Sequence, residues 1–143
     1  RPTTHRALFL LLGALTATAC QREQLTVSVS GNPANVTISA STRGAFGLFE
    51  IPSPIASVSV WPNSGPRYPD WEIRSNRCPS TSHEVRYGTS PGGFEEVLTP
   101  RPLAEGTVYF VIVESCDGNS GGGNFQIENG RVGQILYLVP RDQ

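Results

Sequence analysis

The stretch PLAEGTVYFVIVESC, residues 102–116, decides the fold of this 143-residue chain. Its second half is a run of aromatic and β-branched residues that occupies both alternating positions of an extended chain. We therefore predict a strand that is buried on both faces in the middle of a sheet. Leu103, Gly106 and Tyr109 keep the spacing of a corner in which a loop crosses between two sheets and a tyrosine hydroxyl fixes the turn. The stretch predicts the centre of a two-sheet β fold.

Length and composition are those of one folded domain. Hydrophobic residues make up 38% and charged residues 16% of the chain, which suits a modest core rather than a disordered polymer. The 15 glycines and 12 prolines predict frequent turns and no long helix. The formal net charge is −1 without a basic cluster, so nothing in the sequence indicates a nucleic-acid partner.

The first twenty residues, RPTTHRALFLLLGALTATAC, have the layout of a secretory signal. Arg1 and Arg6 precede the apolar run 7–15, and small residues follow it. This run is too short to cross a bilayer as a helix, which needs about 20 residues. We therefore expect residues 1–19 to be a signal peptide, followed by a tether, 20–23, and a β-sandwich domain, 24–140.

Two processing routes are open at the end of this leader. Ala17-Thr18-Ala19 is an Ala-x-Ala site for ordinary cleavage, which would give a secreted or periplasmic protein. The same residues followed by Cys20 resemble the lipobox of bacterial lipoproteins. That resemblance implies a lipid on the Cys20 thiol and, because Gln21 rather than Asp follows it, anchoring at the outer membrane. The protein would then contact the membrane through its N-terminal lipid.

Three cysteines is an odd number for an exported protein. If Cys20 carries a lipid, Cys78 and Cys116 remain as the two thiols of the mature chain. An oxidising compartment favours a disulfide between them. The alternative is a pair of separate, buried thiols.

Alternating patterns and turn signals divide the chain into about nine strands without a convincing helix. Residues 24–30 and 35–40 alternate apolar and polar side chains around a Gly-Asn-Pro-Ala turn, which predicts a hairpin with one buried face. Many short strands with turns between them predict an antiparallel β-sandwich. The other segments expected to be strands, besides the one in 102–116, are 46–51, 56–60, 71–75, 83–87, 94–98, 125–128 and 131–139.

Glycine-containing segments lie on either side of the predicted strand 125–128. The glycine-rich segment 117–123 predicts a flexible loop. Asn129-Gly130 predicts a tight hairpin turn that returns into 131–139.

From about residue 55 to residue 127, the order of elements resembles a fibronectin type III domain, an immunoglobulin-like sandwich. Trp71 stands where the core tryptophan of the second strand is expected, and HEVRYG, residues 83–88, is similar to the third strand. Leu103, Gly106 and Tyr109 match the corner before the sixth strand. The resemblance implies a seven-stranded domain, to which the hairpin 25–40 and the strand 131–139 are extra. These strands either flank the sandwich or indicate a different sandwich topology.

The resemblance also bears on the cysteine pair. Cys78 would follow the second strand and Cys116 would end the sixth, and the loops at these strand ends lie at the same pole of such a sandwich. A disulfide across this separation would stabilise the fold by roughly 3–4 kcal/mol in the chain-entropy model.

The candidate ligand-binding residues are aromatic. The segment 61–71 carries Trp61, Tyr68 and Trp71 among prolines. Aromatic rings on a proline-stiffened loop make a binding platform at low entropic cost. The alternative is a core Trp71 with Trp61 and Tyr68 folded down as a lid.

Catalytic and metal-binding patterns are weak. His83 is the only histidine after the leader, which rules out a multi-histidine metal site, and no nucleophile elbow accompanies it. The segment 117–128 matches an EF-hand calcium pattern only in part, because Gly121 supplies no side-chain ligand at the fifth position. We therefore predict no enzyme, no bound metal and no cofactor.

Two functional hypotheses follow. The first is a non-catalytic, outer-membrane lipoprotein whose sandwich binds a cell-envelope protein or serves envelope assembly. The second is a secreted carbohydrate-binding accessory domain that uses the aromatic segment 61–71 to hold a glycan.

Overall fold

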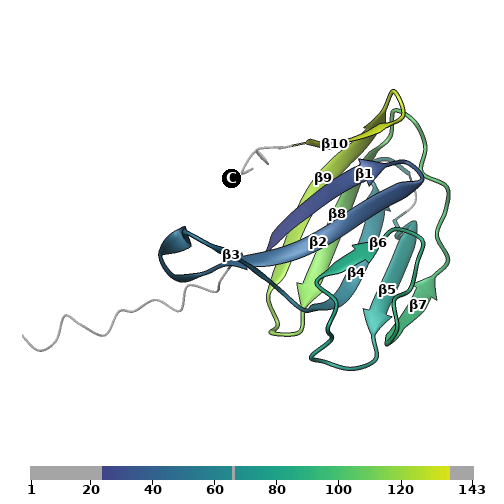
Figure 1. The fold of residues 1–143 in the computed structure, drawn as a ribbon. Coiled ribbons are helices and arrows are strands. Elements are labelled where there is room, and N and C mark those ends of the chain that lie inside the picture. The colour runs from purple at the N-terminus through teal and green to yellow at the C-terminus, as the bar shows by residue number, and fades with distance from the viewer. Residues whose placement is uncertain (1–23, 66, 136–143) are drawn as a thin grey trace, which may run out of the picture.

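Two antiparallel β-sheets pack face to face in the computed structural model, which describes residues 24–65 and 67–135 (Figure 1). The predicted antiparallel sandwich is confirmed, with ten strands in place of about nine. Among the described residues the only helical element is the 3-10 turn η1, Ala45–Gly47. None of the described helical segments has the length and apolar character needed to cross a membrane. The leader, Cys20 and residues 136–140 lie outside the described residues.

The larger sheet has six strands in the order β10-β9-β8-β4-β5-β7. β8 lies between β4 and β9, so the prediction that the stretch 102–116 supplies a central strand is confirmed. The strands of this sheet are β4 (Ile55–Pro62), β5 (Trp71–Ser75), β7 (Phe94–Leu98), β8 (Val108–Ser115), β9 (Ser120–Glu128) and β10 (Arg131–Ile135).

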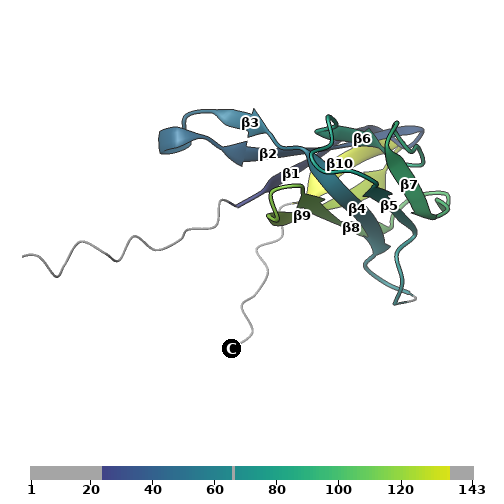
Figure 2. The same cartoon turned by 90° about the horizontal axis from the view of Figure 1, so that it is seen from below.

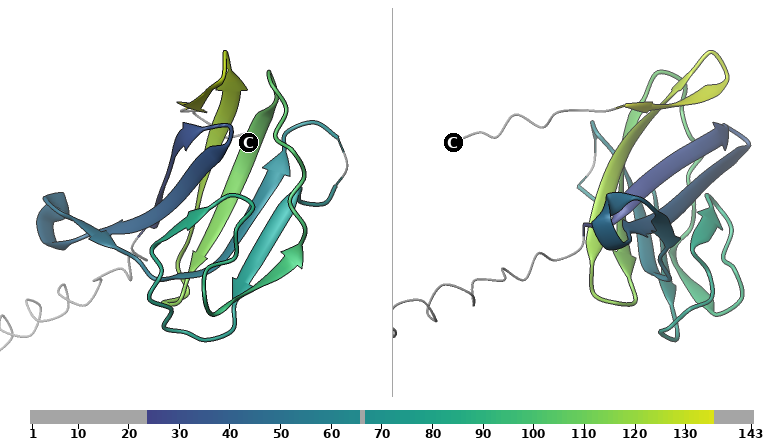
Figure 3. Two further views of the ribbon diagram at one scale, coloured as in Figure 1. Left: turned by 45° about the vertical axis from the view of Figure 1, so that its right-hand side comes forward. Right: turned by 60° about the vertical axis from the view of Figure 1, so that its left-hand side comes forward.

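The smaller sheet is built around the N-terminal hairpin. β2 (Asn35–Arg43) pairs with β1 (Thr26–Asn32) along one edge and with β6 (Glu84–Arg86) and β3 (Glu50–Pro52) along the other. Figure 3 shows this hairpin lying across the six-stranded sheet. The hairpin 25–40 therefore supplies two of the four strands of the smaller sheet. Of the two expected arrangements, the different sandwich topology is the one present, and the hairpin does not flank a complete seven-stranded domain.

The core lies between the sheets and takes alternate residues from each strand. β8 contributes Tyr109, Val111 and Val113 to it, whereas Phe110 is 38% exposed on the opposite side. The expectation that both faces of this strand are buried is therefore wrong, because no described element covers the outer face of the six-stranded sheet. The largest fully buried side chains are Trp71, Tyr109, Phe125, Ile38, Ile55, Ile73 and Ile127.

The tyrosine corner is present, with a changed connection. The Tyr109 hydroxyl accepts a hydrogen bond of 2.8 Å from the backbone N–H of Ala104, and Leu103 packs partly buried against the core. The loop 99–107 joins β7 to β8, and both strands belong to the six-stranded sheet. The corner therefore fixes a crossing over one end of a single sheet, not the predicted passage between two sheets.

The glycine-rich segment is a strand. Residues 120–124 pair with β8, so β9 begins five residues before the predicted strand 125–128. A side chain at Gly121 would overlap the backbone of Leu25, and one at Gly123 would touch Val27. The glycines therefore let the N-terminal hairpin approach the larger sheet closely, and the prediction of a flexible loop is wrong for residues 120–123.

The predicted disulfide between Cys78 and Cys116 is confirmed, with a Cα–Cα distance of 5.4 Å. Cys78 follows β5 and Cys116 follows β8. Both strands run antiparallel to β4, which lies between them, so they run parallel to each other and end at the same pole of the sheet. The bridge closes this pole.

An arm projects from the sandwich at the turn between β2 and β3 (Figures 1 and 2). We define the arm as residues 43–51, with its tip at residues 44–49. The predicted strand 46–51 is only partly correct, because β3 covers Glu50–Pro52 and η1 forms the tip. The large apolar side chains of the arm are exposed to solvent, namely Phe46, Leu48, Phe49 and Ile51.

Candidate binding face on the six-stranded sheet

The outward residues of β4, β8 and β5 form one continuous surface, which we call the outer face. Side chains alternate along a strand, so residues paired across neighbouring strands share a face. The inward residues of β4 fill the core, and its outward residues are Ser57, Ser59 and Trp61. Their partners on the outer face are Glu114, Ile112 and Phe110 of β8, and Arg74 and Glu72 of β5.

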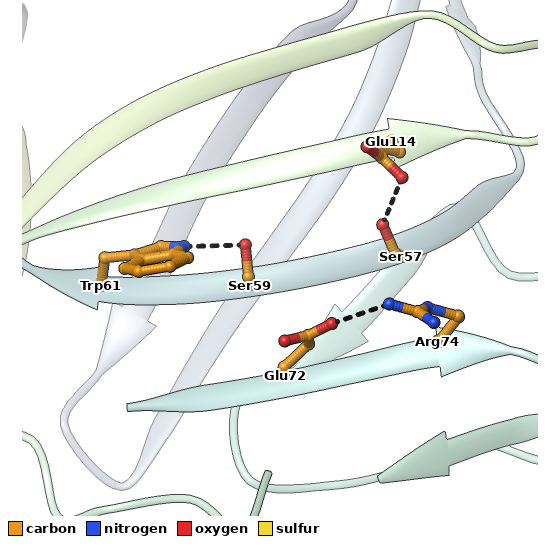
Figure 4. A network of polar contacts seen from close by, with 6 residues as sticks. All are labelled: Ser57, Ser59, Trp61, Glu72, Arg74 and Glu114. Atoms are coloured by element: carbon orange, nitrogen blue, oxygen red, sulfur yellow. Dashed lines mark hydrogen bonds and ion pairs between the residues drawn. The ribbon is translucent and has the colours of Figure 1, made fainter. Parts of the chain in front are cut away.

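Trp61 and Phe110 form the aromatic end of the outer face. They are directly paired across β4 and β8. The indole Nε1 of Trp61 donates a 2.9 Å hydrogen bond to the Ser59 hydroxyl, two residues back on the same strand. This bond holds the indole along the strand, as Figure 4 shows. The Trp61 ring is thereby fixed beside a partly exposed phenyl ring.

Apart from Ile112, the rest of the outer face is polar, and Figure 4 shows these polar side chains. The Ser57 hydroxyl donates a 3.0 Å hydrogen bond to a carboxylate oxygen of Glu114, which joins β4 to β8. Arg74 and Glu72 form an ion pair of 3.2 Å, with side chains 66% and 22% exposed. An exposed pair of this kind contributes little stability, at most about 1 kcal/mol. Its groups remain free to exchange hydrogen bonds with a ligand.

The three aromatic residues predicted to bind a ligand lie in three different environments. Trp71 is fully buried, with its ring centroid 5.0 Å from that of Tyr87. It is a core residue, as the second sequence interpretation expects, and is not accessible to a ligand. Tyr68 is 46% exposed in the loop before β5, and Trp61 lies on the outer face. The segment 61–71 therefore does not gather its aromatic rings into one platform.

Tyr68 belongs to a small polar cluster around Arg101. The guanidinium carbon of Arg101 lies 4.9 Å from the centroid of the Tyr68 ring, and Nη2 donates a 3.2 Å hydrogen bond to the Tyr68 hydroxyl. This hydrogen bond raises the pKa of Arg101. Asp70 is 3.7 Å from the same guanidinium. Tyr68 is thus held by contacts within the protein.

Tyr87 is linked to the same loop. Its hydroxyl donates a 2.7 Å hydrogen bond to the backbone carbonyl of Arg101. Burial, reinforced by the charge of Asp70, raises the pKa of Tyr87 well above its ordinary value. Tyr87 therefore packs against Trp71 in the core and ties the loop through its hydroxyl.

The sequence reasoning missed most of the outer face. It placed Trp61 in a loop, although the strand extends to Pro62 and keeps its alternation. The signal was present in the segment SVSVW, residues 57–61, where two buried valines alternate with two serines and a tryptophan. The sequence predicts Phe110 in the core because apolar residues occupy both alternating sets of positions in β8.

The outer face offers binding chemistry: an immobilised indole, a phenyl ring, hydroxyl groups, carboxylates and a guanidinium. Within the described part of the chain, no group of three or more His, Cys, Asp or Glu side chains is placed to hold a metal ion. No protein-family model matches the chain, and no curated protein or solved structure is significantly similar to it. The function is therefore inferred from the outer face and the leader.

Proposed function

We propose that this protein is a non-catalytic module of the bacterial cell envelope that binds an extended glycan across its outer face. The observation that carries the proposal is the position of Trp61, held along the strand beside Phe110 on an otherwise open sheet. The C–H groups of a sugar ring stack on the face of an aromatic ring. A tryptophan fixed in advance loses little side-chain entropy when it binds.

The polar part of the outer face supplies the complementary contacts. Sugar hydroxyls donate to carboxylates and accept from guanidinium groups, and hydrogen bonds to charged groups are the stronger ones. Glu72 and Arg74 on β5, and Glu114 on β8, lie one or two residue pairs along the strands from the aromatic end. A chain of sugar residues can contact both parts at once, whereas a compact ligand would contact only one.

The leader supports the cellular location in this proposal. The lipobox-like residues Ala17-Thr18-Ala19-Cys20 favour a lipid on Cys20 and anchoring at the outer membrane. Gln24 begins the described domain, so only residues 21–23 would separate the anchor from it. The disulfide between Cys78 and Cys116 is consistent with export to an oxidising compartment.

The ligand is tested by binding to isolated peptidoglycan and to an array of bacterial glycans. We expect the parent protein to bind and Trp61→Ala to weaken binding at least about tenfold, the effect of losing about 1.4 kcal/mol at a binding hot spot. Phe49→Ala is the matched control, because it removes an exposed ring from the arm. Tyr68→Ala separately tests the loop before β5.

Two results would contradict the glycan proposal. One is the absence of binding to every glycan tested, which would favour an envelope protein as the ligand. The other is glycan binding that survives Trp61→Ala, which would place the ligand elsewhere on the surface.

The anchor is tested by the intact mass of the mature protein extracted from native membranes. We expect a mass that includes an acylated Cys20 and that lacks two hydrogens until reductant is added. An unlipidated product in the soluble fraction would remove the anchor. It would leave the outer face to a secreted carbohydrate-binding protein, the second sequence hypothesis.

A further inference from the structure

The tip of the arm exposes an unusual set of apolar side chains. Phe46 is 95% exposed, Leu48 74% and Phe49 69%, and Ile51 at the base is 52% exposed. The tip sequence GAFGLF, residues 44–49, contains no charged or hydrogen-bonding side chain. Contiguous exposed apolar groups on a soluble domain mark a surface that is covered in use.

The backbone of the tip is ordered in a way that presents these side chains. Arg43 pairs with Glu50 at the end of the β2–β3 ladder, and the N–H of Gly44 donates a 2.8 Å hydrogen bond to the carbonyl of Phe49. Phe46 has φ of 64°, a conformation that is costly for a residue with a large side chain. The chain accepts this strain without burying Phe46, which indicates a role for the exposed ring.

The start of the domain lies at the base of the arm. Thr26, the first residue of β1, pairs with Ser41 of β2, two residues before the arm begins. Cys20 is six residues before Thr26, and six extended residues span at most about 20 Å. A lipid on Cys20 would therefore attach within about 20 Å of Thr26, which lies beside the base of the arm.

We propose that the arm inserts its apolar tip into the lipid bilayer to which Cys20 is tethered. This inference rests on the proposed lipid anchor, which brings the tip to the membrane surface. Phe and Leu side chains suit the boundary between headgroups and acyl chains, and the flanking Arg43 and Glu50 suit the headgroup layer. The tip would add an apolar contact with the bilayer that already holds the lipid.

The test uses the mature chain, residues 20–143, with Cys20→Ser so that no lipid masks the arm. Its binding to mixed vesicles of phosphatidylethanolamine and phosphatidylglycerol is measured by flotation. We expect the double substitution Phe46→Ser with Phe49→Ser to lower vesicle binding at least about tenfold. The double substitution Val97→Ser with Leu98→Ser, which removes two exposed apolar side chains of β7 away from the arm, is the matched control and should bind vesicles like the parent.

A second measurement keeps the test independent of any damage to folding. Phe49→Trp places a fluorescent ring at the tip, and its emission is followed against the parent protein as background. We expect a blue shift on addition of vesicles and quenching by brominated acyl chains. Vesicle binding that is unchanged by the double substitution, or a tip that is not quenched, would overturn the proposal. Self-association through the tip without vesicle binding would also overturn it.

The arm and the anchor fail in different ways. Vesicle binding by the Cys20→Ser chain, together with an unlipidated native protein, would keep the arm and remove the anchor. A lipidated native protein whose arm does not bind vesicles would keep the anchor and remove the arm.

Discussion

At the scale of single residues, Tyr109 connects the core to a loop. Its ring is buried and stacks 5.2 Å from that of Phe125, while its hydroxyl holds the N–H of Ala104. The sequence spacing of Leu103, Gly106 and Tyr109 was sufficient to predict this contact. The spacing was sufficient because the corner depends only on residues that are close together in the chain.

Tyr109→Phe should therefore destabilise the fold by about 1 kcal/mol, since the partly buried N–H of Ala104 loses its acceptor while the core packing stays intact. Urea unfolding of the purified domain measures this change. Tyr68→Phe is the matched control, because its hydroxyl contacts an exposed Arg101, and we expect less than about 0.5 kcal/mol. Equal midpoints for parent and Tyr109→Phe would show that the corner hydrogen bond is not stabilising.

The two tryptophans show what residue-scale reasoning leaves undecided. Trp61 and Trp71 are both at strand ends in the same proline-rich region, yet Trp71 is in the core and Trp61 is outside. Their faces follow from strand parity, since Trp71 pairs with the inward Val60, one residue before Trp61. Trp61 can be assigned to the outer face from the alternation of side chains only when β4 is known to continue through it.

At the scale of elements, sequence reasoning recognised the second half of β9, residues 125–128, but not its first part, residues 120–124. Glycines cannot show the alternation of apolar and polar side chains that identifies a strand, so the sequence predicts a loop for residues 121–123. In the sheet the absence of a side chain is what allows β1 to pack against β9, near Leu25 and Val27. The signal for this strand lies in a contact with a segment almost a hundred residues earlier, and no local pattern contains it.

We predict that Gly121→Ala destabilises the fold by about 1–3 kcal/mol, because the new methyl group overlaps the backbone of Leu25 and forces the sheets apart. Gly133→Ala in β10 is the matched control. Its nearest neighbour would be the carbonyl oxygen of Gln126 at 4.0 Å, so we expect no loss of stability. Thermal and urea unfolding of both variants measure the difference. A Gly121→Ala variant as stable as Gly133→Ala would contradict the close packing.

The disulfide also belongs to this scale, since it links the ends of β5 and β8. Replacing both cysteines, Cys78→Ser with Cys116→Ser, should lower the free energy of unfolding by roughly 3–4 kcal/mol, because the unfolded chain regains the freedom of the 38-residue loop. The parent protein in reductant should unfold at the same midpoint as the double variant. Coincident unfolding curves for the oxidised parent and the variant would show that the bridge does not stabilise the fold.

At the scale of the whole molecule, strand content and the sandwich class could be predicted, but the partners of the strands could not. Hydrophobic alternation depends on each strand alone, and it identified the N-terminal hairpin correctly. Which sheet that hairpin completes depends on packing between β1 and β9, which are far apart in the sequence. A local apolar pattern also cannot show whether a segment packs against the rest of the molecule. The apolar residues 46–51 therefore read as a strand, although the tip lies outside the core.

The arm and the sandwich should therefore behave as independent parts. None of the tip side chains that the structure describes belongs to the core, and Arg43 and Glu50 are directly paired. Asn-Gly in place of residues 44–49 would join this pair by a two-residue hairpin turn. We expect the shortened domain to unfold within about 0.5 kcal/mol of the parent, because it loses no buried contact. Urea unfolding of the parent and the shortened domain measures this difference. A large loss of stability would mean that the tip supports the fold. Unchanged stability would show that the fold does not need the tip, so that its exposed apolar side chains have no role in folding.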